Sequence, residues 1–246
     1  MNKEAILFGR VIFAGLQMEL QNGSVVDRYT VQSVLGQGGM ATVFRVKHSI
    51  LGTQHALKVL KPLRSTVFED IIREGRLQAR LDPEFIVPVN DVITIDGTPA
   101  LLMPLVDGCS LREVLNSYRP TPSETAAILA SIARGVAIAH AEGIIHRDLK
   151  PPNILLDVHK GAVRIRVADF GLGVSVDTHE DHRGFAGTPA YSSPEQLSGR
   201  ASPHPAQDLW AIGVIAVECL TGQTPFRGES LEDFREAHEK HLPNLG

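Results

Sequence analysis

Apolar and polar residues alternate along the first part of the chain, in short runs that end at glycines or polar turns. Three such runs occupy residues 29–35, 41–48 and 54–60. They are rich in β-branched residues, and a period of two predicts strands. Two more runs, 87–95 and 100–105, flank the hairpin dipeptide Asp96-Gly97. We therefore expect an antiparallel sheet in this part of the chain.

Elsewhere the apolar residues recur with the period of a helix. One amphipathic helix is predicted over residues 68–79, before Pro83, and others over 111–118, 122–142 and 209–220. The segment 209–220 is apolar on nearly all sides, which at this length indicates burial inside a domain and not a membrane span. The change from strands to helices predicts a boundary between two lobes at residues 104–108.

Composition excludes several classes of function. The 246 residues carry a formal net charge of -4, and the basic residues are scattered, so no nucleic-acid partner is expected. Two distant cysteines, Cys109 and Cys219, fit a reducing compartment. The apolar stretch 5–16 contains Arg10 and is too short to cross a membrane. We expect it to form a strand or short helix that packs on the body of the protein.

A glycine-rich turn and a lysine in an apolar strand are the first candidate site residues. The turn reads Gly36-Gln37-Gly38-Gly39-Met40-Ala41-Thr42-Val43. Its glycines let backbone N–H groups close over phosphate oxygens, although such turns are also common in plain hairpins. Lys58, inside Ala56-Leu57-Lys58-Val59, needs a paired anion, and Glu74 lies sixteen residues later on the predicted helix. Taken singly, either charge could equally be a solvated surface group.

Two further motifs carry the decisive signal. The run His146-Arg147-Asp148-Leu149-Lys150-Pro151-Pro152-Asn153 is followed, sixteen residues after Asn153, by Asp169-Phe170-Gly171. They resemble the catalytic loop and the metal-binding motif of protein kinases. From about Tyr29 to its end the chain is similar to eukaryote-like Ser/Thr protein kinases, most of all to the bacterial members.

The resemblance implies an α+β fold with two lobes. Residues 1–28 would be an N-terminal extension and residues 29–246 the kinase domain. Within that domain, residues 29–105 would form an antiparallel sheet with one helix, and residues 106–246 a mainly helical lobe. Room for the last helices of the second lobe is missing, so we expect that lobe to be incomplete, with Glu195 deprived of its usual arginine partner.

The resemblance also implies the catalytic roles. Asp148 would orient the acceptor hydroxyl and take its proton, and Lys150 would stabilise the charge that develops on the γ-phosphate. Asn153 and Asp169 would hold Mg²⁺, or alternatively Mn²⁺, through their oxygen atoms. Phosphoryl transfer demands alignment and charge neutralisation more than covalent chemistry, which explains why these residue types are needed.

ATP is the expected cofactor, bound between the lobes. Lys58, held by Glu74, would contact its phosphates, Met103 would guard the back pocket, and Pro104 would offer only its carbonyl to the adenine edge. The nucleotide-binding set implied by the family is Leu35, Gly36, Gln37, Gly38, Gly39, Met40, Ala41, Val43, Ala56, Lys58, Met103, Pro104, Val106 and Leu155.

The run Gly187-Thr188-Pro189-Ala190-Tyr191-Ser192-Ser193-Pro194-Glu195 resembles the peptide-docking segment of Ser/Thr kinases. Thr188 is expected to hydrogen-bond to Asp148 and Lys150. With Lys150, this segment predicts Ser or Thr as the acceptor, not Tyr. Asp208 is expected to tie a central helix to the backbone of the catalytic loop.

Several residues raise questions that the resemblance leaves open. Gln78 stands where the family usually places an apolar residue that packs the predicted helix 68–79 against Phe170. A polar group there would weaken the active position of this helix unless it finds a hydrogen-bond partner. Thr178 and Ser175 are candidate phosphorylation sites beside acidic residues, with surface hydroxyls as the alternative. His179 and His182 lack the further ligands of a zinc site.

The expected activity is ATP-dependent phosphorylation of Ser and Thr in proteins, including the protein itself, in signalling. A dimer would serve autophosphorylation. The need for nucleotide predicts a cytoplasmic location, in the chain itself or in the cytoplasmic part of a longer, membrane-anchored protein. The alternatives are a kinase-fold scaffold with weak or no activity, and a small-molecule kinase, which the docking segment disfavours.

Overall fold

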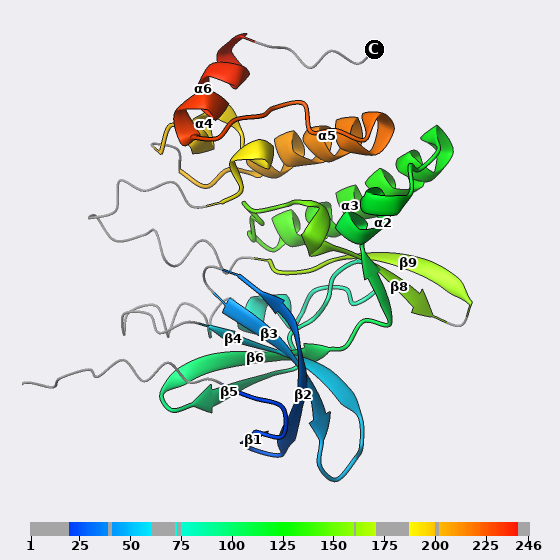
Figure 1. Cartoon of the computed structure of the whole chain (residues 1–246), viewed down its shortest axis with the longest axis vertical. Coiled ribbons are helices and arrows are strands. Elements are labelled where there is room, and N and C mark those ends of the chain that lie inside the picture. Colours follow the sequence, from blue (N-terminus) through cyan, green and yellow to red (C-terminus); the bar gives the residue numbers. More distant parts are fainter. Residues whose placement is uncertain are drawn as a thin grey trace, which may run out of the picture.

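The computed structural model describes residues 20–38, 41–60, 72, 75–159, 161–170, 187–199 and 202–240. They form two lobes, one built on a sheet and the other mainly on helices (Figure 1). The predicted α+β, two-lobed architecture is confirmed. The chain passes between the lobes at residues 105–107, within the predicted boundary.

A six-stranded antiparallel sheet makes up the first lobe, in the order β1-β2-β3-β4-β6-β5. Its strands are β1 (Val25–Val26), β2 (Tyr29–Gln37), β3 (Ala41–His48), β4 (Gln54–Leu60), β5 (Asp91–Ile95) and β6 (Thr98–Pro104). The bounds of β3 and β4 are those predicted from the alternation of residues. The first strand lies inside the predicted N-terminal extension, and residues 1–19 of that extension lie outside the described part of the chain.

The prediction that a strand begins at residue 87 is wrong, because β5 begins only at Asp91. Val87 and Val89 are buried, which produced the strand-like alternation. However, the Val87 amide donates to the carbonyl of Val167 in the second lobe, 2.9 Å away. The segment before β5 therefore bridges the two lobes and does not extend the sheet.

The two faces of the sheet pack into separate apolar clusters. One face, with Val46 and Leu57 fully buried, joins β2, β3, β4, β5 and β6. The opposite cluster includes Ala56 and Met103, and it reaches across to Ala168 and Leu155 of the second lobe. Apolar surface buried in this way supplies the main driving force for folding. The second cluster also fixes how the lobes meet.

The second lobe combines helices with a small sheet of order β7-β8-β9. Its strands are β7 (Gly108–Ser110), β8 (Ile154–His159) and β9 (Ala162–Val167). Its helices are α2 (Leu111–Ser117), α3 (Pro122–Ala141), α4 (Pro194–Leu197), α5 (Pro205–Thr221) and α6 (Leu231–Lys240), with the short 3-10 turns η1 (Pro151–Asn153) and η2 (Pro189–Tyr191). Capping boxes begin α2, α3 and α4, so side chains satisfy the first free backbone amides of these helices.

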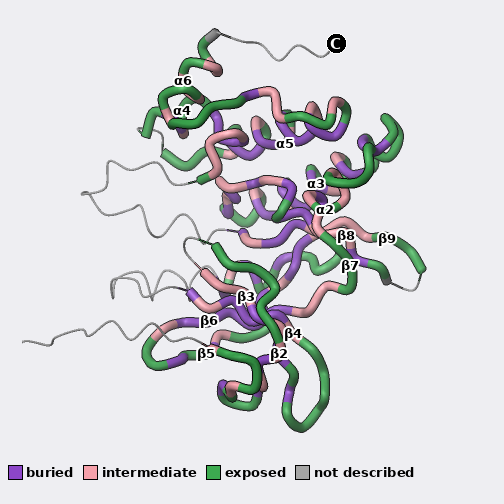
Figure 2. The backbone as a smooth tube through the Cα atoms, in the orientation of Figure 1, coloured by how far each residue is buried: buried purple, intermediate pink, exposed green. Residues whose placement is uncertain are grey.

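The central helix α5 is less deeply buried than predicted. Val214, Ile215 and Cys219 face the core, but Leu209 is 60% and Leu220 is 46% exposed. Figure 2 shows buried and exposed stretches alternating along this helix. No helix in the described ranges is long and apolar enough to cross a membrane.

Candidate active site

Three predicted catalytic residues meet at one point between the catalytic loop and the docking segment. The Lys150 ammonium lies 2.6 Å from Oδ2 of Asp148 and 2.8 Å from Oγ1 of Thr188. The Thr188 hydroxyl in turn donates to Oδ1 of Asp148, at 3.0 Å. The structure therefore has both hydrogen bonds predicted for Thr188. All three side chains are partly buried, which strengthens these interactions relative to water.

Asp208 ties helix α5 to the backbone of the catalytic loop, as predicted. Its carboxylate is fully buried and accepts hydrogen bonds from the amides of His146 (2.9 Å) and Arg147 (2.8 Å). The ring of His140 on α3 lies 2.7 Å from the same carboxylate. A buried carboxylate needs several donors of this kind. The contacts fix the backbone just before Asp148.

Two residues beside the site have left-handed backbone conformations, which are costly for side chains other than glycine. The φ angle of Arg147 is 65° and that of Asp169 is 62°. Each such residue costs about 1 to 3 kcal/mol unless its surroundings hold it. At Arg147 both backbone groups are held, because its amide donates to Asp208 and its carbonyl accepts from Gln196.

His146 connects the catalytic loop to the predicted metal-binding motif. Its Nε2 atom lies 2.9 Å from the carbonyl oxygen of Ala168, and its ring centroid is 4.7 Å from that of Phe170. Both side chains are buried almost completely. The expected structural link between His146 and Phe170 is therefore present, and it holds the residues on both sides of Asp169.

Lys58 on β4 is the predicted phosphate-binding lysine, and its partner here is Asp169. The Nζ atom lies 3.0 Å from Oδ1 of Asp169, and the lysine side chain is 10% exposed. Burial alone would raise the pKa of Asp169, but the charge of Lys58 outweighs it and holds the pKa below its usual value. Glu74, the expected partner of Lys58, lies outside the described residues.

The predicted metal ligands suit Mg²⁺ through their chemistry. Asn153 donates its amide nitrogen to the carbonyl of Asp148 at 2.9 Å, which leaves its oxygen as the group available to a cation. The pKa of Asp169 is lowered by the charge of Lys58, which favours the ionised carboxylate. Across the described ranges, no group of three or more His, Cys, Asp or Glu could hold an ion by itself. Two protein oxygens fit Mg²⁺, which keeps several waters and binds substrate phosphates.

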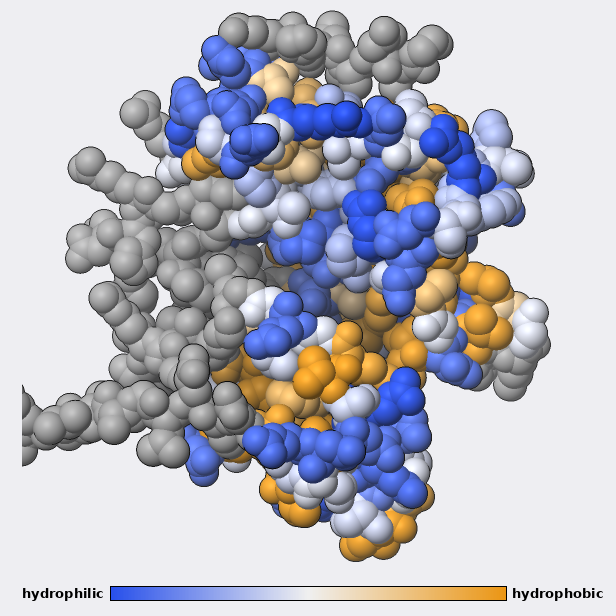
Figure 3. Space-filling view, in the orientation of Figure 1, coloured by the Kyte–Doolittle hydropathy of each residue, from blue (hydrophilic) through white to orange (hydrophobic). Residues whose placement is uncertain are grey.

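Most of the predicted adenine-contacting residues lie together in one apolar cluster. Ala56 and Met103 are buried members, and Val43, Val106 and Leu155 pack against them from both lobes. Such a cluster suits the flat faces of an adenine ring. Leu35 is not part of the cluster and is 44% exposed on β2. Apolar side chains are visible over the sheet and beside the junction of the lobes in Figure 3.

The glycine-rich turn joins β2 to β3, as predicted. Gly36 and Gln37 end β2, Ala41 begins β3, and the amide of Gly38 donates to the carbonyl of Ala41 at 2.8 Å. Pro104 ends β6 at the boundary between the lobes. Several predicted residues lie outside the described part of the chain, namely Gly39, Met40, Glu74, Ser175, Thr178, His179 and His182.

Gln78 and Glu195 were the two positions at which the sequence predicted a missing packing or charge partner. Gln78 is 3% exposed and donates its side-chain amide to the carbonyl of Val87 at 2.9 Å, so it has the hydrogen-bond partner that burial demands. Glu195, which was expected to lack its usual arginine partner, is exposed at the start of α4. Exposure removes the cost of leaving a charge unpaired in the core.

Sequence reasoning missed a polar cluster beside the docking segment. Glu218 of α5 is 4% exposed. It accepts a hydrogen bond from the Tyr191 hydroxyl and forms an ion pair with Arg112, which lies on α2. It also missed Gln196, whose amide reaches the catalytic loop. A glutamate inside an apolar helix was the available signal, because a buried carboxylate must have partners.

Comparisons with known proteins agree with the geometry. The family model described as "Protein kinase domain" matches residues 29–244. Serine/threonine-protein kinase PknL of Mycobacterium tuberculosis is 37% identical over 227 residues, covering 89% of this chain and 56% of the relative. PknH of the same organism is 35% identical over 222 residues, covering 88% and 35%.

A eukaryotic relative and a solved structure extend the comparison. Calcium/calmodulin-dependent protein kinase type II of Caenorhabditis elegans is 35% identical over 206 residues, covering 82% of this chain and 28% of the relative. The Mycobacterium tuberculosis PknI kinase domain has a TM-score of 0.67 at 28% identity, covering 88% of this chain and 86% of that one. The chain thus spans between 28% and 56% of the length of these curated relatives.

Proposed function

Because this chain belongs to the protein kinase family and resembles its Ser/Thr members, we propose that it transfers the γ-phosphoryl group of ATP to Ser and Thr hydroxyls of proteins, itself included, in signalling. The observation that carries the proposal is the mutual hydrogen bonding of Asp148, Lys150 and Thr188. A carboxylate, an ammonium and a docking-segment hydroxyl are held together where an acceptor side chain would enter.

In this mechanism the three residues divide the work. Asp148 accepts a hydrogen bond from the acceptor hydroxyl, orients it and takes its proton as the hydroxyl oxygen bonds to the γ-phosphorus. The bond between that phosphorus and the bridging oxygen of the β-phosphate breaks, and ADP is the leaving group. Lys150 stays protonated and stabilises the negative charge on the transferring group. Thr188 bonds to both side chains and keeps the docking segment against the catalytic loop. Their preset geometry lowers the barrier because little reorganisation remains.

Residues from both lobes would bind the nucleotide. Lys58 would contact its phosphates, and the cluster around Ala56 and Met103 would enclose the adenine. Asn153 and Asp169 would hold Mg²⁺, which neutralises phosphate charge when bound. The requirement for ATP supports a cytoplasmic location for this domain, whether or not it forms part of a longer protein.

The proposal is tested with purified chain, Mg²⁺ or Mn²⁺, ATP and a generic basic protein, followed by mass spectrometry. Asp148→Asn and Asp169→Asn variants are compared with Asp91→Asn, an exposed aspartate on β5. We expect phosphate on Ser or Thr with wild-type and Asp91→Asn protein, and a loss of at least about 100-fold in the other two. Folded wild-type protein that binds ATP but transfers no phosphate would instead indicate a scaffold.

A further inference from the structure

Strand β9 is the last strand of the small sheet, and along most of its length no other described strand covers its outer side. Its neighbours on the inner side are β8 and then β7. On the outer side, the segment before β5 reaches only Val167, whose amide donates to the carbonyl of Phe85 at 2.8 Å and whose carbonyl accepts from Val87 at 2.9 Å. The β8–β9 hairpin lies at the side of the second lobe (Figure 1). The rest of β9 is therefore an open edge.

Backbone groups of alternate residues point toward this open edge. In an antiparallel pair, successive residues direct their N–H and C=O groups to opposite sides of the strand. Val167 directs both groups away from β8, and the next amide, that of Ala168, donates back to Asn153 at 2.8 Å. By this alternation Ile165 and Val163 also point outward. Among the described residues neither has a backbone partner on that side, so two N–H and two C=O groups stay open.

Two arginines stand on one face of β9, beside the open edge. Arg164 lies opposite Asp157 in the register of β8 and β9, and Arg166 is its neighbour on the same face. Both guanidinium groups contact the same oxygen, Oδ2 of Asp157, at 3.1 Å and 2.7 Å. Two positive charges thus share one negative charge.

The excess positive charge of this cluster is partly shielded from water. The side chains of Arg166 and Asp157 are 11% and 9% exposed, and that of Arg164 is 32% exposed. Burial lowers the pKa of Arg166 and the charge of Arg164 lowers it further, against the opposing charge of Asp157. The Nε atoms of both arginines lack a hydrogen-bond partner in the described part of the chain. A second carboxylate beside the arginines would neutralise the excess charge.

We propose that the open edge of β9 binds an extended segment of a partner protein in which acidic and apolar residues alternate. The segment adds a strand to the sheet through the outward groups of Val163 and Ile165. Its acidic side chains lie beside Arg164 and Arg166, and its apolar side chains lie beside Val163, which is 61% exposed. A second copy of this chain is a poor occupant, because pairing two β9 edges brings like charges together. The inference goes beyond the proposed function, since binding needs neither nucleotide nor phosphate transfer.

The probe is a synthetic peptide of about nine residues, the length of a strand, in which glutamate and valine alternate. The same peptide with lysine in place of glutamate is its charge control. Val163→Pro removes one outward N–H at a position where an edge strand tolerates proline, and Val163→Ala is its matched control. Arg164→Gln removes one charge, while Arg166 still pairs with Asp157 and keeps that carboxylate compensated.

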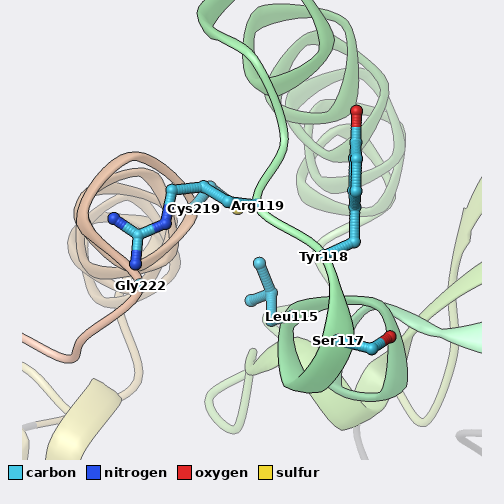
Figure 4. Close-up of a pocket in the computed structure, with 6 residues that line it drawn as sticks. All are labelled: Leu115, Ser117, Tyr118, Arg119, Cys219 and Gly222. Atoms are coloured by element: carbon cyan, nitrogen blue, oxygen red, sulfur yellow. The ribbon is translucent and has the colours of Figure 1, made fainter.

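Arg119→Gln is the control for the loss of an exposed arginine elsewhere. Arg119 lines a pocket of about 220 Å³, whose walls come from α2, α5 and the residues that follow each helix. Figure 4 shows its side chain extending toward α5. Melting temperatures verify that every variant is folded.

We expect the acidic peptide to bind the whole chain, as measured by titration calorimetry. Val163→Pro should raise the dissociation constant at least about fivefold, and Arg164→Gln at least about threefold. Val163→Ala and Arg119→Gln should stay within about twofold of wild type, and the lysine peptide should bind at least about tenfold more weakly. Added salt should weaken binding of the acidic peptide, because the arginines are partly exposed to solvent.

Hydrogen exchange locates the bound peptide. Exchange of the amides of Val163 and Ile165 should slow at least about tenfold when the peptide is added, while exchange in α5 stays unchanged. The inference is overturned if about 1 mM peptide does not bind, or if Val163→Pro and Arg164→Gln leave its binding unaltered. Neither outcome bears on phosphate transfer, so this inference and the proposed function fail separately.

Discussion

Lys58 and Asp169 form an ion pair between the two lobes, with 3.0 Å between the ammonium nitrogen and a carboxylate oxygen. The lysine comes from the sheet of the first lobe and the aspartate from the segment after β9. An ion pair that joins the lobes makes their closure depend on charge as well as on apolar packing.

The first prediction concerns this pair. Lys58→Met leaves the Asp169 carboxylate without its cation, and we expect a loss of about 1 to 2 kcal/mol in the free energy of unfolding at pH 7. The loss is smaller than for a fully buried pair because Asp169 is 31% exposed. Urea denaturation measures it. Lys47→Met, at an exposed position on β3, is the matched control and should change stability little.

The pair also predicts a pH dependence. The pKa of Asp169 is lowered in the folded chain, so its contribution is complete above the unfolded value of about 3.9 and is lost as the pH falls through the folded pKa. The stability difference between wild type and Lys58→Met should therefore be constant from pH 6 to 8 and shrink in acid below about pH 4. A difference that grows in acid would contradict this assignment.

Asp208 provides a test of how the catalytic loop is supported. Its carboxylate accepts from two backbone amides and faces the ring of His140, all without exposure to solvent. Asp208→Ala strands these donors, and we expect a loss of about 3 to 5 kcal/mol in unfolding free energy. Asp208→Asn, which keeps an acceptor oxygen, should lose less. Equal stability of all three proteins would refute the role.

Two glycines should respond oppositely to alanine. A Cβ atom on Gly108 would overlap the carbonyl oxygen of Leu156, so Gly108→Ala must push β7 away from β8 and weaken the junction of the lobes. Gly213, inside α5, has open space around it. Gly213→Ala should therefore be neutral or stabilising, by up to about 1 kcal/mol. Thermal unfolding of both variants and nucleotide affinity of Gly108→Ala provide the measurement.

The two thiols should differ in reactivity. Burial raises the pKa of Cys219 to about 11, whereas Cys109 is exposed on β7. Only the thiolate reacts, so at pH 8 an alkylating reagent should modify Cys109 in the folded chain and reach Cys219 only after denaturation. Mass spectrometry of the labelled peptides decides the point. Rapid labelling of Cys219 in folded protein would show that α5 opens easily.

The elements that sequence predicted best are those whose pattern depends on local chemistry. Alternation gave the bounds of β3 and β4, and the helical period of apolar residues predicted a helix that begins at residue 122, where α3 begins. The segment at Val87 was misassigned because its apolar residues serve contacts with the other lobe. The spacing of apolar residues in such a run does not reveal whether they pack within the sheet or against the other lobe.

In the candidate site, too, sequence predicted the residues that belong to a local motif and missed those that depend on tertiary contacts. Asp148, Lys150 and Thr188 were found by motif, because phosphoryl transfer constrains their type and spacing. The contacts of Arg112 with Tyr191 and Glu218 escaped detection, since these partners lie on distant segments and an arginine on a short helix is usually a solvated charge. The exposure of Glu195 could not be predicted from its motif for the same reason, because burial depends on the neighbours that the fold supplies.

The side chain of Gln196 connects helix α4 to the catalytic loop. Its carbonyl oxygen accepts from the Ser193 amide at the start of α4, and its amide nitrogen donates to the carbonyl of Arg147, beside Asp148. One side chain thus caps the beginning of a helix and holds the backbone of the left-handed residue that precedes Asp148. Unwinding of α4 would break the hydrogen bond from Gln196, and with it one of the two contacts that hold the backbone of Arg147.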